Sequence, residues 1–210
     1  MLHYYYRFLR WCPGALGLLL RQKLYKRLLG KCGNNVLFGR FVDFVHPHRI
    51  SLGDRAIVSD NVTLTASDYQ GDNYTIVIDD DVFVGKATLL HARENTIIVK
   101  SGANIGSSCK IVANLPISVG KNVLLAAYCY IGENKAKKCN SAPKKELPFI
   151  CQTKTVIEDG CWLGVRVEVL SGAHVGKDSI VGAHAVVAGE IPAWAIAVGR
   201  PAKVIRFRNI

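Results

Sequence analysis

Hydrophobic positions recur every six residues over most of this chain. All but the first three residues that open these hexads are Leu, Ile or Val. The openers are Cys32, Phe38, Phe44, Leu52, Val58, Leu64, Ile78, Val84, Leu90, Val99, Ile105, Ile111, Val119, Leu125, Ile131, Ile157, Leu163, Val169, Val175, Val181 and Val187. A repeat this short and regular predicts a solenoid, because each unit can bury its apolar side only against its neighbours.

The fifth residue of each first and second hexad is small or apolar, as at Val36, Ala56, Cys109 and Cys161. Such residues can point into a narrow prism, so three hexads predict one triangular coil. Coils would stack as parallel strands about 4.8 Å apart, and seven of them give a prism roughly 34 Å tall. Glycines at the second hexad position are expected at corners, where left-handed or crowded backbone is needed. The predicted fold is an all-β, parallel β-helix.

Insertions into the repeat all follow the third hexad of a coil, which places them on one edge of the prism. By far the longest is 132–156, which carries six lysines and two glutamates. The repeat ends near Ile191, and residues 192–210 are expected to close the prism. We therefore divide the chain into a leader (1–31), a β-helix domain (32–191) and a closing tail.

The leader 1–31 predicts an amphipathic helix over 15–29, with Leu16, Leu20, Leu24 and Leu28 on one stripe. Seven Lys and Arg and no acidic residue occur in 1–35. Two interpretations are open. The helix caps the open end of the solenoid, or it lies in the plane of an anionic membrane surface, where each basic side chain adds about 1 kcal/mol. The aromatic residues before the helix favour the membrane. No segment predicts a spanning helix or a signal peptide.

Net charge and cysteine content exclude several classes of protein. The net charge of +11 is confined to the leader and the long insertion, and neither contains a nucleic-acid-binding motif, so no nucleic-acid partner is expected. Seven cysteines lack metal-site spacing, and their odd number argues for a reducing cytosol. Cys109, Cys129 and Cys161 are expected to fill the core. The six histidines do not supply the three-His spacing of a zinc enzyme, so no metal is expected.

Three features of the sequence carry a family resemblance. The hexads, the run DGCWLGVRVEVLSGAHVGKDSIVGAHAVV and the tail EIPAWAIAVGRPAKVIR resemble the hexapeptide-repeat acyltransferases, especially those that O-acetylate sugars and polysaccharides. The resemblance covers about 32–206. It implies a left-handed β-helix, in contrast to the usual right-handed crossover, and a homotrimer with active sites between subunits.

The resemblance also implies acetyl-CoA as the acyl donor, lying along the last coils. Its pantetheine arm would pass Trp162, Gly164 and the pair Gly182–Ala183. Arg200 and Lys203 match the motif that closes over the nucleotide end, and the ammonium of Lys203 would suit its phosphates.

The sequence departs from this family at the catalytic base. Acyl transfer to an alcohol needs a base within reach of the hydroxyl and donors for the developing oxyanion. The family places a His three or four residues after the equivalent of Ile131, and this chain has Asn134 and Lys135 there.

Three explanations for the missing base are open. His91, two coils below the insertion and oriented by Glu94, could act as the base. His174, on the same edge one coil above, is a second candidate. The third explanation is that catalysis has been lost.

The beginning of the insertion is expected to hold the acceptor. Lysine is a poor base at its ordinary pKa of about 10.4, so Lys135, Lys137 and Lys138 are better suited, with Asn134, to binding an anionic group. The acceptor would be a lipid-linked sugar diphosphate or an acidic glycan; a solvated charged face is the simpler interpretation.

The leading hypothesis is an acetyl-CoA-dependent O-acetyltransferase acting on a sugar in envelope or exopolysaccharide synthesis. The expected location is the cytoplasm, peripheral to the inner face of the cytoplasmic membrane. The alternatives are a serine- or amino-sugar-type acetyltransferase on the same fold, and a catalytically silent trimeric scaffold.

Overall fold

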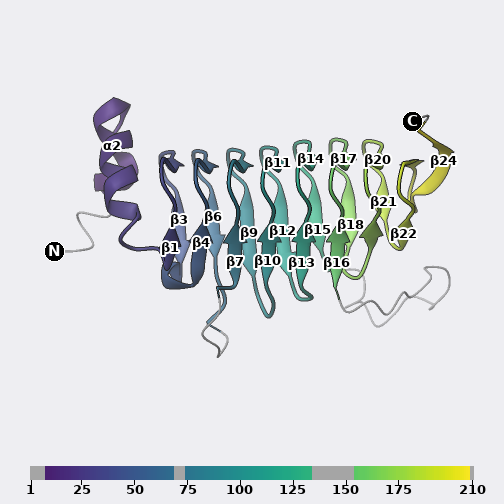
Figure 1. The fold of residues 1–210 in the computed structure, drawn as a ribbon, viewed down its shortest axis with the longest axis horizontal. Coiled ribbons are helices and arrows are strands. Elements are labelled where there is room, and N and C mark those ends of the chain that lie inside the picture. The colour runs from purple at the N-terminus through teal and green to yellow at the C-terminus, as the bar shows by residue number, and fades with distance from the viewer. Residues whose placement is uncertain (1–7, 69–73, 134–153, 209–210) are drawn as a thin grey trace, which may run out of the picture.

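The structure, a computed structural model, describes residues 8–68, 74–133 and 154–208. The described chain is a left-handed parallel β-helix with a helix at one end and a short hairpin at the other (Figure 1). The predicted fold class is therefore confirmed. The acceptor-binding candidates Asn134, Lys135, Lys137 and Lys138 lie outside the described residues, as does most of the long insertion.

Three sheets form the faces of the prism, and we name them A, B and C in the order in which the chain visits them. Sheet A contains β1 (Lys31–Cys32), β4 (Ile50–Leu52), β7 (Ile76–Ile78), β10 (Ile97–Val99), β13 (Ile117–Val119), β16 (Thr155–Ile157), β19 (His174–Val175) and β22 (Glu190–Ile191). Sheet B contains β2 (Leu37–Phe38), β5 (Ile57–Val58), β8 (Phe83–Val84), β11 (Asn104–Ile105), β14 (Leu124–Leu125), β17 (Trp162–Leu163), β20 (Ile180–Val181), β23 (Ala195–Val198) and β24 (Lys203–Phe207).

Sheet C contains β3 (Asp43–Val45), β6 (Thr63–Thr65), β9 (Leu89–Ala92), β12 (Lys110–Ala113), β15 (Tyr130–Gly132), β18 (Glu168–Leu170) and β21 (Val186–Val187). Each coil therefore contributes one strand to each face. The corners between faces are called A–B, B–C and C–A below.

The strand register follows the six-residue repeat. Leu52 pairs with Cys32 below and Ile78 above, and Val119 pairs with Val99 and Ile157, although more than thirty residues separate Val119 from Ile157. The hexad openers after Cys32 that are fully buried include Phe38, Leu52 and Ile131, and the fifth-position residues named above are also buried. The hydrophobic effect of one continuous column of aliphatic side chains thus holds the coils together.

The backbone conformation at the corners differs from the prediction in one respect. The left-handed residue is the fourth of each first and second hexad, not the second. In twelve of these fourteen positions it is not glycine: Asn35, Phe41, Arg55, Asn61, Asp81, Ala87, Ser108, Asn122, Tyr128, Arg166, Asp178 and His184, with Gly102 and Gly160 completing the set. An isolated left-handed residue costs only about 1–2 kcal/mol, which the stacked coils on both sides can impose.

The corners are crowded at the second hexad position, as expected, and this explains the glycines there. A Cβ on Gly85 would lie 2.5 Å from the carbonyl carbon of Gly106 in the next coil, and one on Gly106 would lie 2.7 Å from that of Ala126. Consecutive coils approach too closely here for a side chain.

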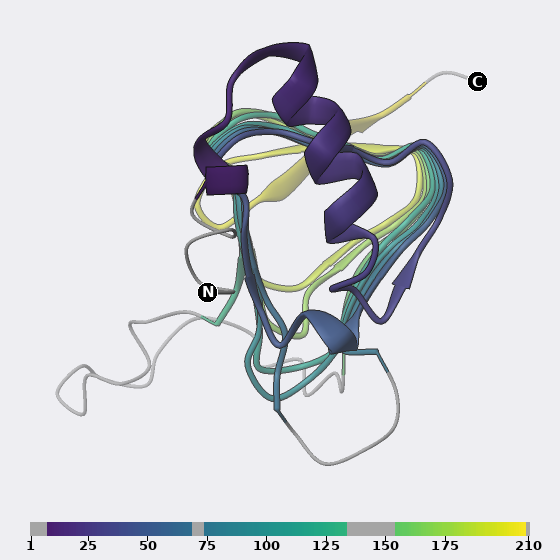
Figure 2. The same ribbon diagram turned by 90° about the vertical axis from the view of Figure 1, so that its left-hand side faces the viewer.

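All insertions leave from the C–A corner, as predicted. The first contains a 3-10 helix, η1 (Pro47–Arg49), and the others join β6 to β7, β9 to β10, β12 to β13 and β15 to β16. In the view along the prism, the fully described connections, from β3 to β4, β9 to β10 and β12 to β13, extend from a single corner of the triangle (Figure 2).

Helix α2 (Gly14–Tyr25) lies across the N-terminal end of the prism (Figure 2). Its buried residues are Gly17, Arg21 and Tyr25, and the Tyr25 ring meets Phe38 and Phe44 edge-on. The predicted apolar stripe is therefore wrong in part, since Leu16 is 66% exposed and Leu20 and Leu24 only flank the contact. The helix caps the solenoid with the adjacent face, which carries Gly17, Arg21 and Tyr25.

Arg21 is a charged residue of α2 that the structure buries. Its guanidinium donates to the carbonyl oxygens of Phe38 (3.0 Å), Leu9 (3.1 Å) and Cys12 (2.8 Å). These carbonyls belong to the first coil and to the residues before α2. Arg21 therefore replaces water for backbone groups at the open end of the prism, where no further coil supplies donors.

The C-terminal residues begin an eighth coil and then reverse. Ile191 of β22 pairs with Val175, and Ala197 of β23 pairs with Val181. Strand β24 runs antiparallel to β23 and all of its residues are exposed.

Replacing Gly85 by Ala is expected to lower the free energy of unfolding by about 1–3 kcal/mol, because the added methyl group overlaps the backbone of the next coil. The matched change Ala87→Gly, two residues away in the left-handed position, relieves about 1 kcal/mol of backbone strain against a similar cost in entropy. Its stability should stay near that of the parent in urea unfolding. Equal losses in both variants would contradict this assignment of roles.

Candidate functional site

A polar cluster covers the end of sheet C where the long insertion leaves. His91 on β9 pairs with Val112 on β12, and one residue earlier Ile111 pairs with Ile131 on β15, so Val112 lies opposite Gly132. His91 therefore lies two strands, about 10 Å, from the start of the insertion. Its side chain is partly buried on the outer face of the sheet. The position is the one that the sequence predicted for it.

Three further residues of this cluster come from the next two coils. Asn95 donates through Nδ2 to the Asn114 carbonyl oxygen (2.6 Å), and Asn114 donates through its own Nδ2 to Glu133 Oε2. The Tyr130 hydroxyl donates to the Glu133 carbonyl oxygen (3.0 Å). These bonds fix the backbone and side chain of Glu133, the last described residue before the insertion continues.

Burial and charge adjust the acid–base properties of the cluster. Burial and the nearby Arg93 guanidinium lower the pKa of His91 below its ordinary value of 6.5. Burial and the Glu133 carboxylate raise the pKa of Tyr130. At neutral pH His91 is therefore the neutral imidazole, which can accept a proton, and Tyr130 keeps its hydroxyl proton.

Glu94, expected to orient His91, makes no side-chain hydrogen bond or ion pair among the described residues. Its backbone N–H donates to the Ala113 carbonyl oxygen (3.2 Å), and its side chain is exposed. The orienting role stays a prediction. In the described structure Arg93 is the charged residue that influences His91.

His174 is held between two carboxylates on sheet A. Its Nε2 lies 3.0 Å from Glu158 Oε1 and its Nδ1 lies 3.7 Å from Glu190 Oε1. With both ring nitrogens facing acids, this geometry suits a structural ion pair better than a free base. At least three strand spacings, about 14 Å, separate β19 from β9 along the prism. His91 and His174 therefore do not form one site.

The expected cofactor residues gather at the C-terminal end of the B–C corner. A Cβ on Gly164 would lie 2.6 Å from the backbone nitrogen of Ala183, so these two corners stack directly. The Gly182 N–H donates to the Ala197 carbonyl oxygen (2.8 Å). Trp162, on the adjoining outer face of sheet B, is 50% exposed. Backbone and aromatic surface are thus available along one edge.

The tail reaches the same corner. Val186 N–H donates to the Gly199 carbonyl oxygen (2.9 Å), and Ala202 N–H donates to the Val186 carbonyl oxygen (2.7 Å). Arg200 lies 3.2 Å from Glu168 Oε1, while Lys203 begins β24 opposite Val198. The structure therefore brings the six predicted cofactor residues to one end of the prism, and their role stays a prediction.

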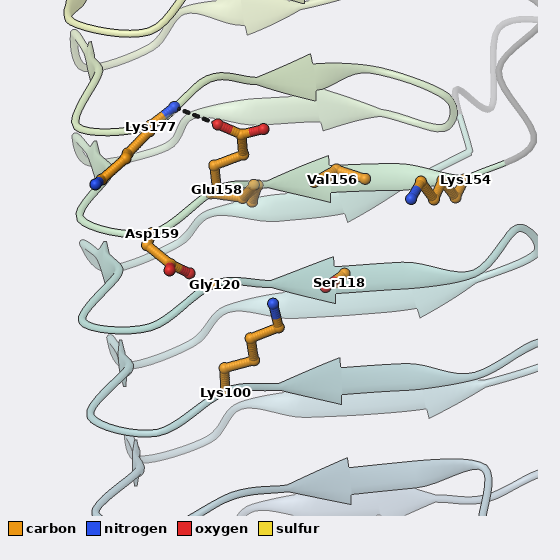
Figure 3. A pocket seen from close by; sticks show the side chains of 9 residues that line it. Lys100, Ser118, Gly120, Lys154, Val156, Glu158, Asp159 and Lys177 are labelled. Atoms are coloured by element: carbon orange, nitrogen blue, oxygen red, sulfur yellow. Dashed lines mark hydrogen bonds between the residues drawn. The ribbon is translucent and has the colours of Figure 1, made fainter.

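A shallow cavity of about 300 Å³ lies across the outer face of sheet A and its A–B corner (Figure 3). Three lysines, Lys100, Lys154 and Lys177, line it together with two acidic residues, Glu158 and Asp159. Glu158 accepts from the Lys177 backbone N–H (2.8 Å) as well as facing His174. Lys154 is the first described residue after the long insertion, so the cavity lies beside the point where that insertion rejoins the prism.

The sequence did not single out Arg93, Asn114, Tyr130 or Glu133 as site residues. They are ordinary polar residues from three consecutive coils, and only the strand register makes them neighbours. The six-residue repeat could have revealed this, because it places the three ends of β9, β12 and β15 in one column. Among the described residues, no three His, Cys, Asp or Glu side chains meet as a metal site requires.

The fold is a β-helix built from six-residue repeats, and the comparisons with known proteins agree with it. Residues 154–189 match the family model described as bacterial transferase hexapeptide (six repeats). The chain is 34% identical over 130 residues to a probable acetyltransferase of Mycobacterium tuberculosis, covering 61% of this chain and 43% of that protein. It is 32% identical over 100 residues to WbbJ of Escherichia coli, named for O-acetyl transfer in lipopolysaccharide biosynthesis, covering 44% of this chain and 51% of WbbJ.

Two solved structures share the fold. The N-acyltransferase AntD of Bacillus cereus, in complex with dTDP and 3-hydroxybutyryl-CoA, has a TM-score of 0.59 at 16% identity, covering 90% of this chain and 88% of AntD. The polysialic acid O-acetyltransferase OatWY has a TM-score of 0.57 at 20% identity, covering 85% and 86%. The chain spans about half or less of the two curated relatives above. The resemblance to hexapeptide-repeat acyltransferases is confirmed.

The contacts of Glu158 predict a loss of stability in acid. Burial alone would raise its pKa, but the hydrogen bonds from His174 and the Lys177 backbone outweigh burial and lower it. The folded state therefore keeps Glu158 ionised to a lower pH than the unfolded chain does. Its stabilising contribution is present above the unfolded-state pKa and disappears as pH falls through the folded-state pKa.

The variant Glu158→Gln should accordingly unfold at a lower temperature than the parent at neutral pH and lose less of its stability on acidification. Thermal unfolding followed by circular dichroism across the acidic range measures both effects. Glu94→Gln, which removes an exposed carboxylate, is the matched control and should reproduce the parent profile. A Glu158→Gln profile parallel to the parent would rule out this linkage.

Proposed function

We propose that this protein is an acetyl-CoA-dependent acyltransferase that O-acetylates a sugar of an envelope polysaccharide or of a lipid-linked glycan precursor. One observation carries the proposal. His91 is a partly buried, neutral imidazole beside the start of the long insertion, on a β-helix whose relatives are named as acetyltransferases.

The reaction follows from these positions. The His91 imidazole takes the proton of an acceptor hydroxyl as that oxygen attacks the thioester carbonyl carbon. A new C–O bond forms, the C–S bond breaks, and the leaving thiolate of CoA recovers the proton from His91. The Glu133 carboxylate, held by Asn114 Nδ2, would accept a hydrogen bond from a second sugar hydroxyl and so help to orient the acceptor.

The acyl donor would lie along the B–C corner. Gly164, Gly182 and Ala183 leave the backbone open to the pantetheine arm, and Lys203 supplies a cation for the phosphates. AntD was solved with an acyl-CoA, which supports this donor for the fold.

An anionic acceptor fits the charge of the sheet A cavity. Three lysines, Lys100, Lys154 and Lys177, line it against two carboxylates, Glu158 and Asp159, which leaves a small positive excess. The insertion beside it carries five more lysines, including Lys135, Lys137 and Lys138. This excess suits a phosphate or an acidic sugar. AntD was also solved with dTDP and OatWY is named for polysialic acid, so proteins of this fold recognise anionic molecules of both kinds.

The protein would act as a homotrimer. The outer face of sheet B exposes a column of large apolar residues, Leu37 (36%), Ile57 (38%), Leu124 (42%) and Trp162 (50%). A subunit interface would bury this column.

Replacing His91 by Ala should reduce turnover of acetyl-CoA with the acceptor by roughly 10²–10⁴-fold, the usual contribution of a general base. Release of free CoA thiol, measured with a panel of glycan precursors bearing hydroxyl or amino groups, follows the reaction and separates O- from N-acylation. Exposed His48 gives the matched control, His48→Ala. Full activity of His91→Ala together with inactive His174→Ala would transfer the role to His174.

The pH profile separates a base from a structural histidine. The parent should lose activity on acidification through a pKa below 6.5, because His91 becomes protonated there. Arg93→Gln removes one cause of that low pKa, so the acidic limb of the profile should move to higher pH. An unchanged limb in the Arg93→Gln variant would show that the titrating group is not His91, and a parent that releases no CoA with any acceptor would favour the silent scaffold.

Replacing Lys203 by Ala should raise the KM for acetyl-CoA about tenfold with a smaller effect on kcat, since one phosphate contact is worth about 1–2 kcal/mol. The control is Lys86→Ala, at the same corner but near the other end of the prism. Equal KM values for the two variants would remove Lys203 from the cofactor site.

A further inference from the structure

Helix α2 presents two different faces. At 100° per residue, the buried residues Gly17, Arg21 and Tyr25 centre on one side of the helix, and Leu16, Leu19 and Lys23 centre on nearly the opposite side. The first face caps the prism. The second is largely exposed, with Leu16 at 66% and Leu19 at 61%, and Leu19 and Lys23 border a hollow that Cys32 and Val36 of the first coil also line.

The helical turn before α2 adds two exposed aromatic side chains at the same end of the chain. Phe8 is 54% and Trp11 60% exposed, so two aromatic and two leucine side chains face solvent at one end of the molecule. Large apolar side chains that gather in this way mark a surface that another phase or molecule covers.

The charge around this apolar face has one sign. Lys23, Lys26, Arg27 and Lys31 are exposed beside it. The first acidic residue of the whole chain is Asp43, which lies 3.6 Å from Arg10. Basic residues next to Trp, Phe and Leu are the composition of a helix that lies at the surface of an anionic bilayer.

From this arrangement we propose that the N-terminal cap is a peripheral docking surface for anionic lipid. Phe8, Trp11, Leu16 and Leu19 enter the acyl-chain boundary, and Lys23, Lys26, Arg27 and Lys31 meet the headgroup phosphates. On this proposal the capping interpretation applies to one face of the helix and the membrane interpretation to the other. Among the described residues, no helix has the length and apolar character to cross a bilayer.

The fold makes such docking compatible with a stable protein. Arg21 and Tyr25 fix α2 to the first coil, so the outward face is displayed on a rigid support and binding costs little ordering entropy. Since α2 and β24 lie at opposite ends of the prism (Figure 1), a membrane on the cap leaves the C-terminal corner accessible.

Co-sedimentation of the full chain with vesicles tests the proposal. Binding should be strong to phosphatidylcholine vesicles that contain phosphatidylglycerol, weak to phosphatidylcholine alone, and reduced by salt. The double variant Leu16→Ser with Leu19→Ser should lower the partition coefficient at least tenfold. Lys23→Gln with Lys26→Gln should lower it about fivefold per charge removed.

The opposite end supplies the matched control. Ile205 and Phe207 on β24 are 61% and 57% exposed and lie near Lys203 and Arg206, so Ile205→Ser with Phe207→Ser changes a similar surface elsewhere. This variant should bind vesicles like the parent. Circular dichroism melting should show all variants folded, because every changed side chain is exposed.

Three results would overturn the proposal: no binding by the parent, parent-like binding by the helix variants, or equal loss in the β24 control. Sedimentation equilibrium without lipid tests whether a second copy of this chain binds this face instead. A change of oligomeric state in the Leu16/Leu19 variant would assign the face to contacts between copies of this chain.

Discussion

The close approach of consecutive coils is the constraint on which the rest of the structure depends. Parallel strands about 4.8 Å apart leave no space for a Cβ where Gly85 meets Gly106 or where Gly164 meets Ala183. The same spacing holds the fourth hexad residue in a left-handed conformation even when it is Ala87 or Tyr128. The A–B and B–C corners therefore admit little variation in length, and every insertion leaves from the C–A corner.

That constraint also builds the candidate site. His91, Asn114 and Glu133 are about twenty residues apart in the chain, one coil each, and the register places them at the end of one sheet. A base, a hydrogen-bonding amide and a fixed carboxylate thus come together on rigid strands, which favours precise orientation of a substrate. The neutral state of His91 depends on tertiary contacts too, since burial and Arg93 lower its pKa.

The two ends of the prism solve the same problem differently. A solenoid leaves unpaired backbone at its termini. At the C-terminus β24 folds back on β23. At the N-terminus the Arg21 guanidinium satisfies three carbonyl oxygens and Tyr25 covers the aromatic core. Because a helix has several faces and the cap uses one, the N-terminal end can carry a second function.

The sequence alone determined the repeat, the register, the buried columns and the edge from which insertions leave, because a period of six in side-chain hydrophobicity is a local property. It also placed Trp162, Gly182 and Lys203 at one end. Only the tertiary structure decided that Arg21 is buried while Leu16 is exposed, since both lie on one helix and packing against the first coil chooses the face. It likewise decided that Glu158 and Glu190 both face His174, and that Arg93 lies near His91, because side chains from different coils meet only after stacking.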